Sequence, residues 1–372
     1  GSMHPSSRKR LSSTHIDRYA YLSTVLCLVV GLTTSGIVEA QSDCAPLPPP
    51  VGTILEVHPA EASQLRSIVL GAGPDTTILL HDGLYDMSGG DSNSRLVFNT
   101  PGVTLRSVSG NREAVVLDGG YATDELISIR ASNVTIADLT LKRAYNHPVH
   151  MSGSPGDPIA GNILHNIHII DPGQQAIKVN AVEDGYVDYG VIRCSRIELT
   201  DTGRAQVRDN CYTGGIDVHK AWGSVVHDNW IEGFWCDNGL SEHGIHFWST
   251  SRDTLVEENV IVDCARGIGY GLREVSQTRE YPDDPYPDIG YIGHIDGVIR
   301  NMEIEIVRNQ GKSLGQAKRI GAQAKKQWEL SRTLARFEAA GVQARYERCD
   351  VADPAALSAF VQKIFESDVI RG

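Results

Sequence analysis

The chain has 372 residues, of which 41% are hydrophobic, so it is long enough to bury a large core. Its formal net charge is −12, which argues against nucleic acid as a partner, because phosphate binding needs a basic surface. An anionic polysaccharide remains compatible with this charge, provided that the binding site itself is locally basic.

The first 40 residues have the composition of a tag scar followed by a secretory signal. Basic residues 8–10 precede the apolar run 21–32, and small residues lead to Ala40. A membrane span needs ~20 apolar residues, so the run is too short for an anchor and fits a cleaved signal. We therefore predict that the mature chain begins near Gln41, is secreted, is a monomer and does not contact a membrane.

Residues 41–60 form a proline-rich lead-in to the folded part. Residues 62–70 have helical spacing and are expected to cover the open end of a stack of repeats. Residues 77–80, 95–98 and 103–105 are predicted to be the first strands.

Two apolar patterns recur through the middle of the chain. Pairs of aliphatic residues five positions apart begin at residues 136, 164, 192, 226, 256 and 299, at intervals of 28, 28, 34, 30 and 43 residues. Between them lie segments in which apolar and other residues alternate, at 147–151, 175–179, 214–219, 243–247 and 266–270. Repeats of this length, too short to include helices, predict parallel strands wound into a β-helix with one turn per repeat.

The segments 103–106, 133–138 and 259–262 resemble the repeat of the right-handed parallel β-helix, pectin-lyase-like superfamily. Asn229 and Asn259 occupy the same repeat position on adjacent turns, which resembles the stacked asparagine ladder of that family. The resemblance covers about residues 50–309 and implies an all-β solenoid. It does not select one activity, since this fold carries lyases, hydrolases, epimerases and non-catalytic adhesins.

Export makes the cysteines candidates for disulfides, and of the seven, Cys27 is removed with the predicted signal. Cys211 and Cys236 lie in inserts at equivalent places on neighbouring turns, which predicts that they pair. Cys194 and Cys264 do not match in repeat position, and we expect each to be a small buried apolar residue.

Outward-facing residues of the second pattern stack into columns, because parallel strands lie ~4.8 Å apart. The central column is His150, Lys178, Asp217, His246 and Gly269. The neighbouring columns add further polar groups, so that histidines, two cations, an aspartate and a tryptophan gather on one face. The candidate substrate-binding residues are His147, His150, Gln175, Asn180, His243 and Trp248.

This set of side chains suits β-elimination from a uronate-containing polysaccharide. The reaction needs a cation at the carboxylate, a base for the C5 proton and an acid at the leaving oxygen. Lys178 or Arg266 is the candidate cation, and His219 or His246 the candidate base, with Asp217 orienting the imidazole. Lyases of the resembled fold often use Lys, Arg or His on this face.

Other functions fit the same residues. His219, Asp217 and His246 offer ligands for zinc, although the sequence assigns no firm metal site or cofactor beyond a divalent cation such as calcium. Hydrolysis would use two carboxylates, and Glu242 is the obvious second one. Epimerase chemistry, or glycan binding without chemistry as in an adhesin, is the remaining alternative.

His165 and His168 fall on a different face, where we expect solvated side chains. Arg204 and Arg208 precede Cys211 and either lean over the candidate site or lie in a solvated loop. The insert 273–294 holds tyrosines among prolines and aspartates, which fits either sugar stacking or a loop packed by its own tyrosines.

The periodicity stops after residue 309, and residues 310–372 are predicted to form a helix–strand–helix tail. Residues 329–341 and 346–357 resemble a fragment of a polyketide-synthase-type ketoreductase, a short-chain dehydrogenase relative. The glycine-rich dinucleotide turn and the Tyr-x-x-x-Lys/Asn motif of that family are absent from the tail, so no reductase activity is expected. The predicted domains are therefore residues 1–40, 41–60, 61–309 and 310–372.

Overall fold

The computed structural model describes residues 27–31, 44–208, 210–237, 239–272, 278–284, 286–289, 291–305 and 343–347. The chain forms two compact units, residues 1–38 with 340–372 and residues 39–339. In the first unit, β1 (Cys27–Gly31) pairs antiparallel with β30 (Gln343–Glu347). The rest of the predicted signal and tail, and the boundary at residue 310, lie outside the described residues.

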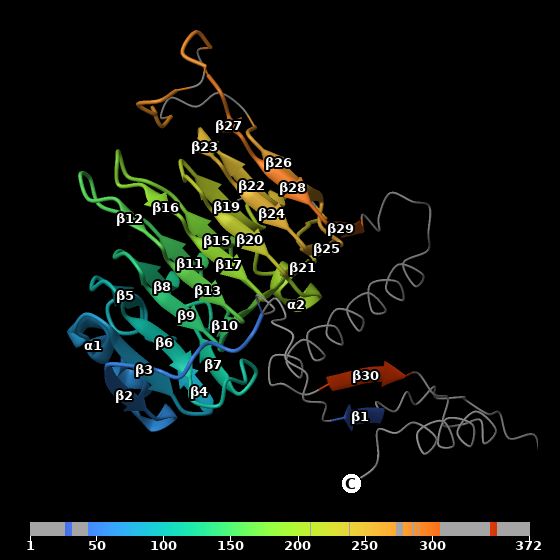
Figure 1. Ribbon diagram of the computed structural model, residues 1–372. Helices are drawn as coiled ribbons and strands as arrows, with labels where there is room; N and C mark the ends of the chain where they lie inside the picture. The colour runs from blue at the N-terminus through green and yellow to red at the C-terminus, as the bar shows by residue number, and fades with distance from the viewer. Residues whose placement is uncertain are drawn as a thin grey trace, which may run out of the picture. The chain divides into compact units, whose positions relative to one another are not determined.

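The second unit is built from three long sheets whose strands all pair in parallel, and Figure 1 shows successive turns stacked in chain order. The first sheet comprises β2 (Thr53–Val57), β3 (Thr76–Leu80), β6 (Thr104–Ser107), β9 (Thr135–Ala137), β13 (Ile163–His165), β17 (Val191–Arg193), β20 (Val225–His227), β24 (Leu255–Glu257) and β28 (Val298–Arg300). The second comprises β4 (Gly83–Asp86), β7 (Val115–Asp118), β10 (Thr140–Lys142), β14 (His168–Ile170), β18 (Arg196–Glu198), β21 (Trp230–Glu232), β25 (Val260–Val262) and β29 (Glu303–Glu305). The third comprises β5 (Leu96–Phe98), β8 (Glu125–Ile129), β11 (His147–Met151), β15 (Gln175–Val179), β19 (Gly214–His219), β22 (His243–Trp248) and β26 (Arg266–Tyr270).

The predicted parallel β-helix is therefore confirmed, down to the register of its core residues. Leu164 pairs with Ile136 and Ile192, and Ile169 pairs with Leu141 and Ile197. The aliphatics of each repeat thus form continuous buried columns inside the coil. Two short parallel pairs lie beside these sheets: β12 (Ile159–Ala160) with β16 (Val187–Asp188), and β23 (Ser251–Arg252) with β27 (His294–Ile295).

A tight corner joins the first and second strands of each repeat and sets the five-residue spacing. One residue at this corner has a positive φ on every turn from β9 to β28: Asp138, Asn166, Cys194, Asp228, Glu258 and Asn301. Asp and Asn tolerate this left-handed conformation better than most residues do, which explains their recurrence here.

The asparagine ladder lies directly after this corner and is confirmed. Asn229 Nδ2 donates to Asn259 Oδ1 at 2.9 Å, and both side chains are fully buried. Asn229 Nδ2 also donates to the Ile192 carbonyl at 2.9 Å, and Asn259 Nδ2 donates to the Val226 carbonyl at 2.8 Å, so each amide satisfies a backbone group of the preceding turn.

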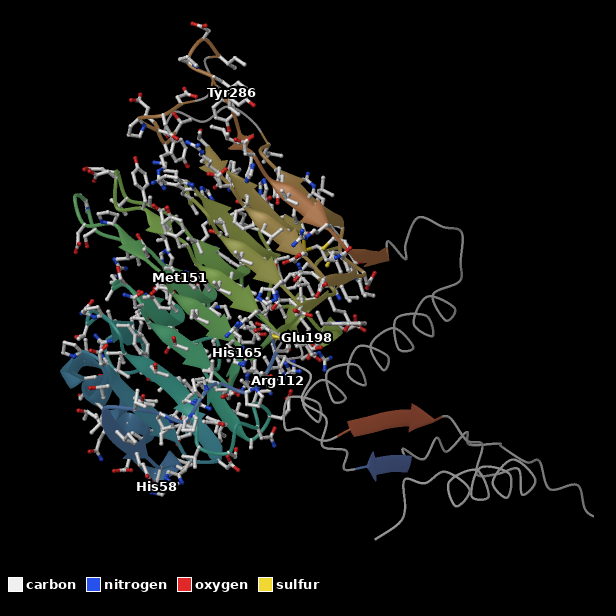
Figure 2. All side chains as sticks on the ribbon, viewed as in Figure 1. His58, Arg112, Met151, His165, Glu198 and Tyr286 are labelled. Carbon is white, nitrogen blue, oxygen red and sulfur yellow. A yellow bond between two sulfur atoms is a disulfide. The ribbon has the colours of Figure 1, made fainter. Side chains whose placement is uncertain are left out.

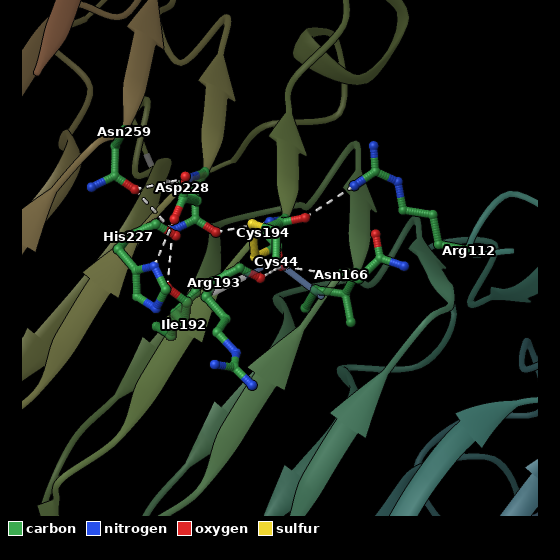
Figure 3. The surroundings of a disulfide bond; sticks show 12 residues. Cys44, Arg112, Asn166, Ile192, Arg193, Cys194, His227, Asp228 and Asn259 are labelled. Carbon is green, nitrogen blue, oxygen red and sulfur yellow. Dashed lines mark hydrogen bonds and ion pairs between the residues drawn. A yellow bond between two sulfur atoms is a disulfide. The ribbon is translucent and has the colours of Figure 1, made fainter. Parts of the chain in front are cut away.

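Two disulfides join parts of the coil among the described residues. Cys211 pairs with Cys236, as predicted, and Cys264 is buried and free. The expectation for Cys194 was wrong: it pairs with Cys44 of the lead-in (Figure 3). Its position at the left-handed corner places its side chain at the edge of the coil, within reach of the lead-in.

The prediction that the His165 and His168 face is solvated was also wrong. His165 and His168 are only 1% and 4% exposed. His168 lies between two carboxylates, Glu113 at 2.9 Å and Glu198 at 3.0 Å. The lead-in also runs along this side of the coil (Figure 1), where Arg106 donates to the Pro48 carbonyl at 2.9 Å.

One end of the coil is covered by a helix, as predicted. Following η1 (Pro59–Glu61), α1 (Ala62–Gly71) buries Leu65 and Val69 against the first turns. The remaining described helix is the single turn α2 (Asp201–Arg204). None of the helices in the described part of the chain has the length and apolarity of a membrane-spanning segment.

The insert after β26 packs on the coil at its base and extends away at its tip. Tyr281 is buried and donates its hydroxyl to the Thr250 carbonyl at 2.8 Å, and Arg279 bonds Asp188 at 2.6 Å. Tyr286 is 43% exposed and lies in the protruding part (Figure 2). Packing by its own tyrosines therefore accounts for the base of the insert.

Candidate functional site

The third sheet brings the central column together in the predicted order. The register pairs His150 with Lys178, Lys178 with Asp217, Asp217 with His246, and His246 with Gly269. His219 pairs with Trp248 on the adjacent column. Side chains from four successive turns therefore meet on one face.

A buried ion pair forms the centre of this face. Lys178 Nζ donates to Asp217 Oδ2, and their side chains are only 9% and 4% exposed. His219 Nε2 lies 3.0 Å from Lys178 Nζ and 3.2 Å from Asp217 Oδ2. On the other side of the carboxylate, Trp248 Nε1 donates to Asp217 Oδ1 at 2.9 Å. Asp217 thus organises a cation, an imidazole and an indole.

The charges of this centre follow from burial and pairing. Burial alone would raise the pKa of Asp217, but the Lys178 ammonium and the bond from His219 hold it well below its usual range. Burial likewise opposes the charged form of Lys178, yet Asp217 outweighs it and raises the pKa. Burial lowers the pKa of His219, so this imidazole is neutral at neutral pH.

His246 lies under the surface rather than on it. It is 0% exposed, and its Nε2 lies 2.9 Å from the Gly271 carbonyl, which accepts the hydrogen bond. Its ring stacks on Trp248 with 5.2 Å between centroids. Since Nε2 donates to Gly271, the other ring nitrogen, Nδ1, is the one that lies 3.6 Å from Asp217 Oδ1.

The other candidate binding residues form a second cluster on the preceding turns. His150 Nδ1 bonds Glu125, and its Nε2 lies 2.8 Å from Asn180 Oδ1. His147 Nδ1 bonds the Gln175 carbonyl at 3.0 Å, and burial lowers the pKa of His147 to about 4. The Gln175 side chain is fully buried, so it faces away from any ligand on the surface.

An open pocket of about 500 Å³ lies beside the ion pair. It is lined by Tyr212, Asp217, Glu242, Trp248, Arg266 and Leu272. Among the described residues, no carboxylate forms an ion pair with Arg266, so its guanidinium is available to an anionic ligand. Tyr212 lies over the buried centre, with its hydroxyl 3.4 Å from Lys178 Nζ.

Sequence reasoning missed Tyr212 and Leu272 as pocket residues. Both lie in inserts between strands, where the repeat pattern assigns no direction to a side chain. The position of Tyr212 could have been inferred from its neighbour Cys211, since the predicted disulfide brings this insert beside the next turn. Arg204 and Arg208 are held elsewhere, with their guanidinium groups 3.4 Å and 3.2 Å from the rings of Trp235 and Tyr145.

A cluster of possible metal ligands beside the pocket differs from His219, Asp217 and His246, the set that the sequence offers as an alternative. Ligand atoms of Glu242, His243 and His246 lie within 4.8 Å of one another. Two imidazoles and one carboxylate suit zinc, whereas calcium takes six to eight oxygen ligands. These residues therefore fit a transition metal better than calcium.

No family model and no curated protein matches this chain. Solved structures similar to it include an alginate lyase from Paenibacillus sp. str. FPU-7, at 13% identity and a TM-score of 0.38, covering 68% of this chain and 95% of that one. Pectate lyase Pel9A is similar at 10% identity and a TM-score of 0.37, covering 70% and 81%. A mannuronic acid specific polysaccharide family 6 lyase from human gut microbiota has 14% identity and a TM-score of 0.33, covering 68% and 67%.

Proposed function

We propose that this protein is a secreted β-helix enzyme that cleaves a uronate-containing polysaccharide by β-elimination in the pocket beside Asp217. The observation that carries the proposal is the Arg266 guanidinium, which lines the pocket without an ion pair in the described part of the chain. A guanidinium binds a carboxylate through two parallel hydrogen bonds, which suits the acid group of a uronate. The indole of Trp248 lines the same pocket and offers a surface on which a sugar ring stacks.

His219 is the base in this proposal. When its Nε2 carries the hydrogen, it donates to Asp217 and leaves the Nδ1 lone pair directed away from the ion pair. The 3.0 Å approach of Lys178 Nζ to this nitrogen is then a contact without a hydrogen bond, since Lys178 donates to Asp217 and Tyr212 instead. The imidazole is 20% exposed and neutral, so it is able to accept the C5 proton. The C5–H electron pair then forms the C4=C5 double bond as the C4–O bond breaks.

Tyr212 is the proposed acid. Its hydroxyl borders the pocket and donates its proton to the departing oxygen, and the nearby Lys178 ammonium stabilises the phenolate that remains. Lys178 and His246 are too deeply buried to meet the sugar, so we assign them to positioning Asp217 and Trp248. On the preceding turns, His147, His150 and Asn180 are the proposed contacts for neighbouring sugar units, and His243 is a further one on the turn of Glu242.

Glycan binding without chemistry is the second candidate function. It is favoured by one observation, namely that Lys178 and Asp217 neutralise each other in the interior. In that case the pocket would present only Arg266, Trp248 and Tyr212 to a bound sugar.

The experiment is an ultraviolet assay for unsaturated uronates with alginate, pectate and glycosaminoglycans. Replacing Arg266 by Gln is expected to lower kcat/KM by ~10²–10³-fold, the usual loss when a group that stabilises developing charge is removed. Arg300→Gln is the matched control, since Arg300 is exposed on β28 and pairs with Glu257. Equal activity of Arg266→Gln and wild type would refute the assignment, and binding without product in wild type would favour the second function.

A further inference from the structure

Glu242, which lines the pocket, lies close to His243 and His246. Both imidazoles direct at it a nitrogen without a hydrogen-bond partner among the described residues. The Nδ1 atoms of His243 and His246 are both buried, and neither has a hydrogen-bond partner in the described part of the chain. Both face one carboxylate oxygen, Glu242 Oε2, at 3.9 Å and 3.8 Å. These separations are too long for hydrogen bonds.

The same separations are close to those between two ligands of one metal ion. Ligand atoms that lie ~2.0–2.1 Å from a zinc ion at tetrahedral or trigonal angles are roughly 3.3–3.6 Å apart. The Glu242 contacts exceed this by a few tenths of an ångström, which small side-chain rotations remove. Asp217 Oδ1, 3.6 Å from His246 Nδ1, adds negative charge on the inner side.

The hydrogen bonding of the two histidines leaves one nitrogen of each for ligation. His246 donates from Nε2 to the Gly271 carbonyl, so its Nδ1 is the nitrogen that faces Glu242. The Nδ1 of His243 faces the same carboxylate oxygen. Arg266 lines the pocket beside Glu242 and repels a bound cation, and the carboxylates of Glu242 and Asp217 offset that repulsion.

Gly269 fixes the place of His243. A Cβ atom at position 269 would lie 2.6 Å from His243 Nε2, so the ring occupies the space that any larger residue would need. Gly269 pairs with His246 in the register, directly beneath the cluster. The glycine at the end of the central column thus permits the two imidazoles to approach each other, with 4.3 Å between ring centroids.

We propose that Glu242, His243 and His246 bind a divalent transition metal, with zinc as the best match, and leave a coordination position open toward the pocket. Imidazole ligands select zinc over calcium. The proposal goes beyond the proposed function and does not depend on it, because metal binding is measured on the protein alone.

The test is a titration of the full chain with Zn²⁺ against a chromophoric chelator, with Co²⁺ as a spectroscopic probe of the ligand geometry. The disulfides must stay oxidised, because reduced Cys44 and Cys194 would form a second cluster with Asp228. We expect one tight site per chain that excess Ca²⁺ does not occupy. Glu242→Gln and His243→Gln should each weaken Zn²⁺ binding at least ~10–100-fold, because this is already the loss when only a hydrogen-bond partner of a metal ligand is removed.

Three further variants make the outcome unambiguous. Gly269→Ala should weaken Zn²⁺ by displacing His243 while keeping every ligand. His168→Gln should leave the affinity unchanged, because His168 bonds its two glutamates directly and has no space for an ion. Arg266→Gln should tighten Zn²⁺ binding while it lowers kcat/KM for β-elimination ~10²–10³-fold. The opposite signs separate failure of this proposal from failure of the proposed function.

Absence of a tight site, or equal affinity in wild type, Glu242→Gln and His243→Gln, would overturn the proposal. Glu242 is partly exposed, so its replacement by the isosteric Gln should leave the fold intact, as a urea unfolding midpoint will verify.

Discussion

At the scale of single residues, Asp217 is the group on which the site depends. It receives bonds from Lys178, His219 and Trp248, each from a different turn or column of the coil. A buried ion pair of this kind contributes little net stability, because desolvation offsets the attraction. Its value is positional: it fixes where an imidazole and an indole face the pocket.

We predict that Lys178→Met destabilises the protein by about 3–5 kcal/mol, because it leaves the Asp217 carboxylate buried without its counter-ion. The double variant Lys178→Met/Asp217→Asn should regain most of this loss, since the neutral amide still accepts from Trp248. Urea unfolding of the four proteins in this cycle measures the effect. A double variant no more stable than Lys178→Met alone would contradict the account.

Buried histidines give the stability a defined pH dependence. The pKa values of His147, His243 and His294 are each lowered to about 4, with burial as the first cause. In the unfolded chain the pKa of each histidine is about 6.5, so between about pH 4 and 6.5 the unfolded state binds more protons than the folded state.

Stability should therefore fall as the pH drops from about 6.5 toward about 4, the window between the unfolded and folded pKa values. The measurement is the urea midpoint at several pH values with a chelator present, so that metal release does not contribute. His294 does not line the pocket, and the substitution His294→Gln should make stability depend less on pH in this window. A midpoint independent of pH in this window would show that these imidazoles are not buried as described.

At the scale of elements, the inserts and the lead-in supply a pocket wall and the disulfide cysteines outside the repeats. The coil supplies columns of side chains, whereas the insert with Tyr212 forms one wall of the pocket. Cys44–Cys194 holds the lead-in to a corner of the coil, and Cys211–Cys236 joins the inserts of two neighbouring turns. Cys211–Cys236 spans 25 residues, and Cys44–Cys194 spans 150.

Removal of Cys44–Cys194 by a double Ser substitution should destabilise the chain more than removal of Cys211–Cys236. The entropy of loop closure predicts losses of about 5 and about 3–4 kcal/mol respectively. Removal of Cys211–Cys236 should lower activity more than removal of Cys44–Cys194, because Cys211–Cys236 positions Tyr212. Thermal unfolding together with the ultraviolet assay tests both halves, and a reversed order in either would count against these roles.

At the scale of the whole molecule, the fold was predictable because one structural unit repeats. The aliphatics of each turn must stack, so their spacing in sequence determines both the sheets and the register. That register in turn places Lys178, Asp217 and His246 side by side. The burial of each member was not predictable, because it depends on how side chains from different turns pair.

Features that join distant segments were also not predictable from the sequence. The Cys44–Cys194 disulfide links residues that share no repeat position. It holds the lead-in against a side of the coil that the sequence pattern predicts to be solvated. The pocket walls from Tyr212 and Leu272 belong to inserts of unequal length, which have no periodic pattern from which to predict a direction.

The most direct test of the central claim is mass analysis of the oligosaccharides released in water labelled with a heavy oxygen isotope. β-Elimination breaks the C4–O bond without adding water, so we predict products that contain an unsaturated uronate and no label. Products that carry one heavy oxygen would establish hydrolysis and contradict the account.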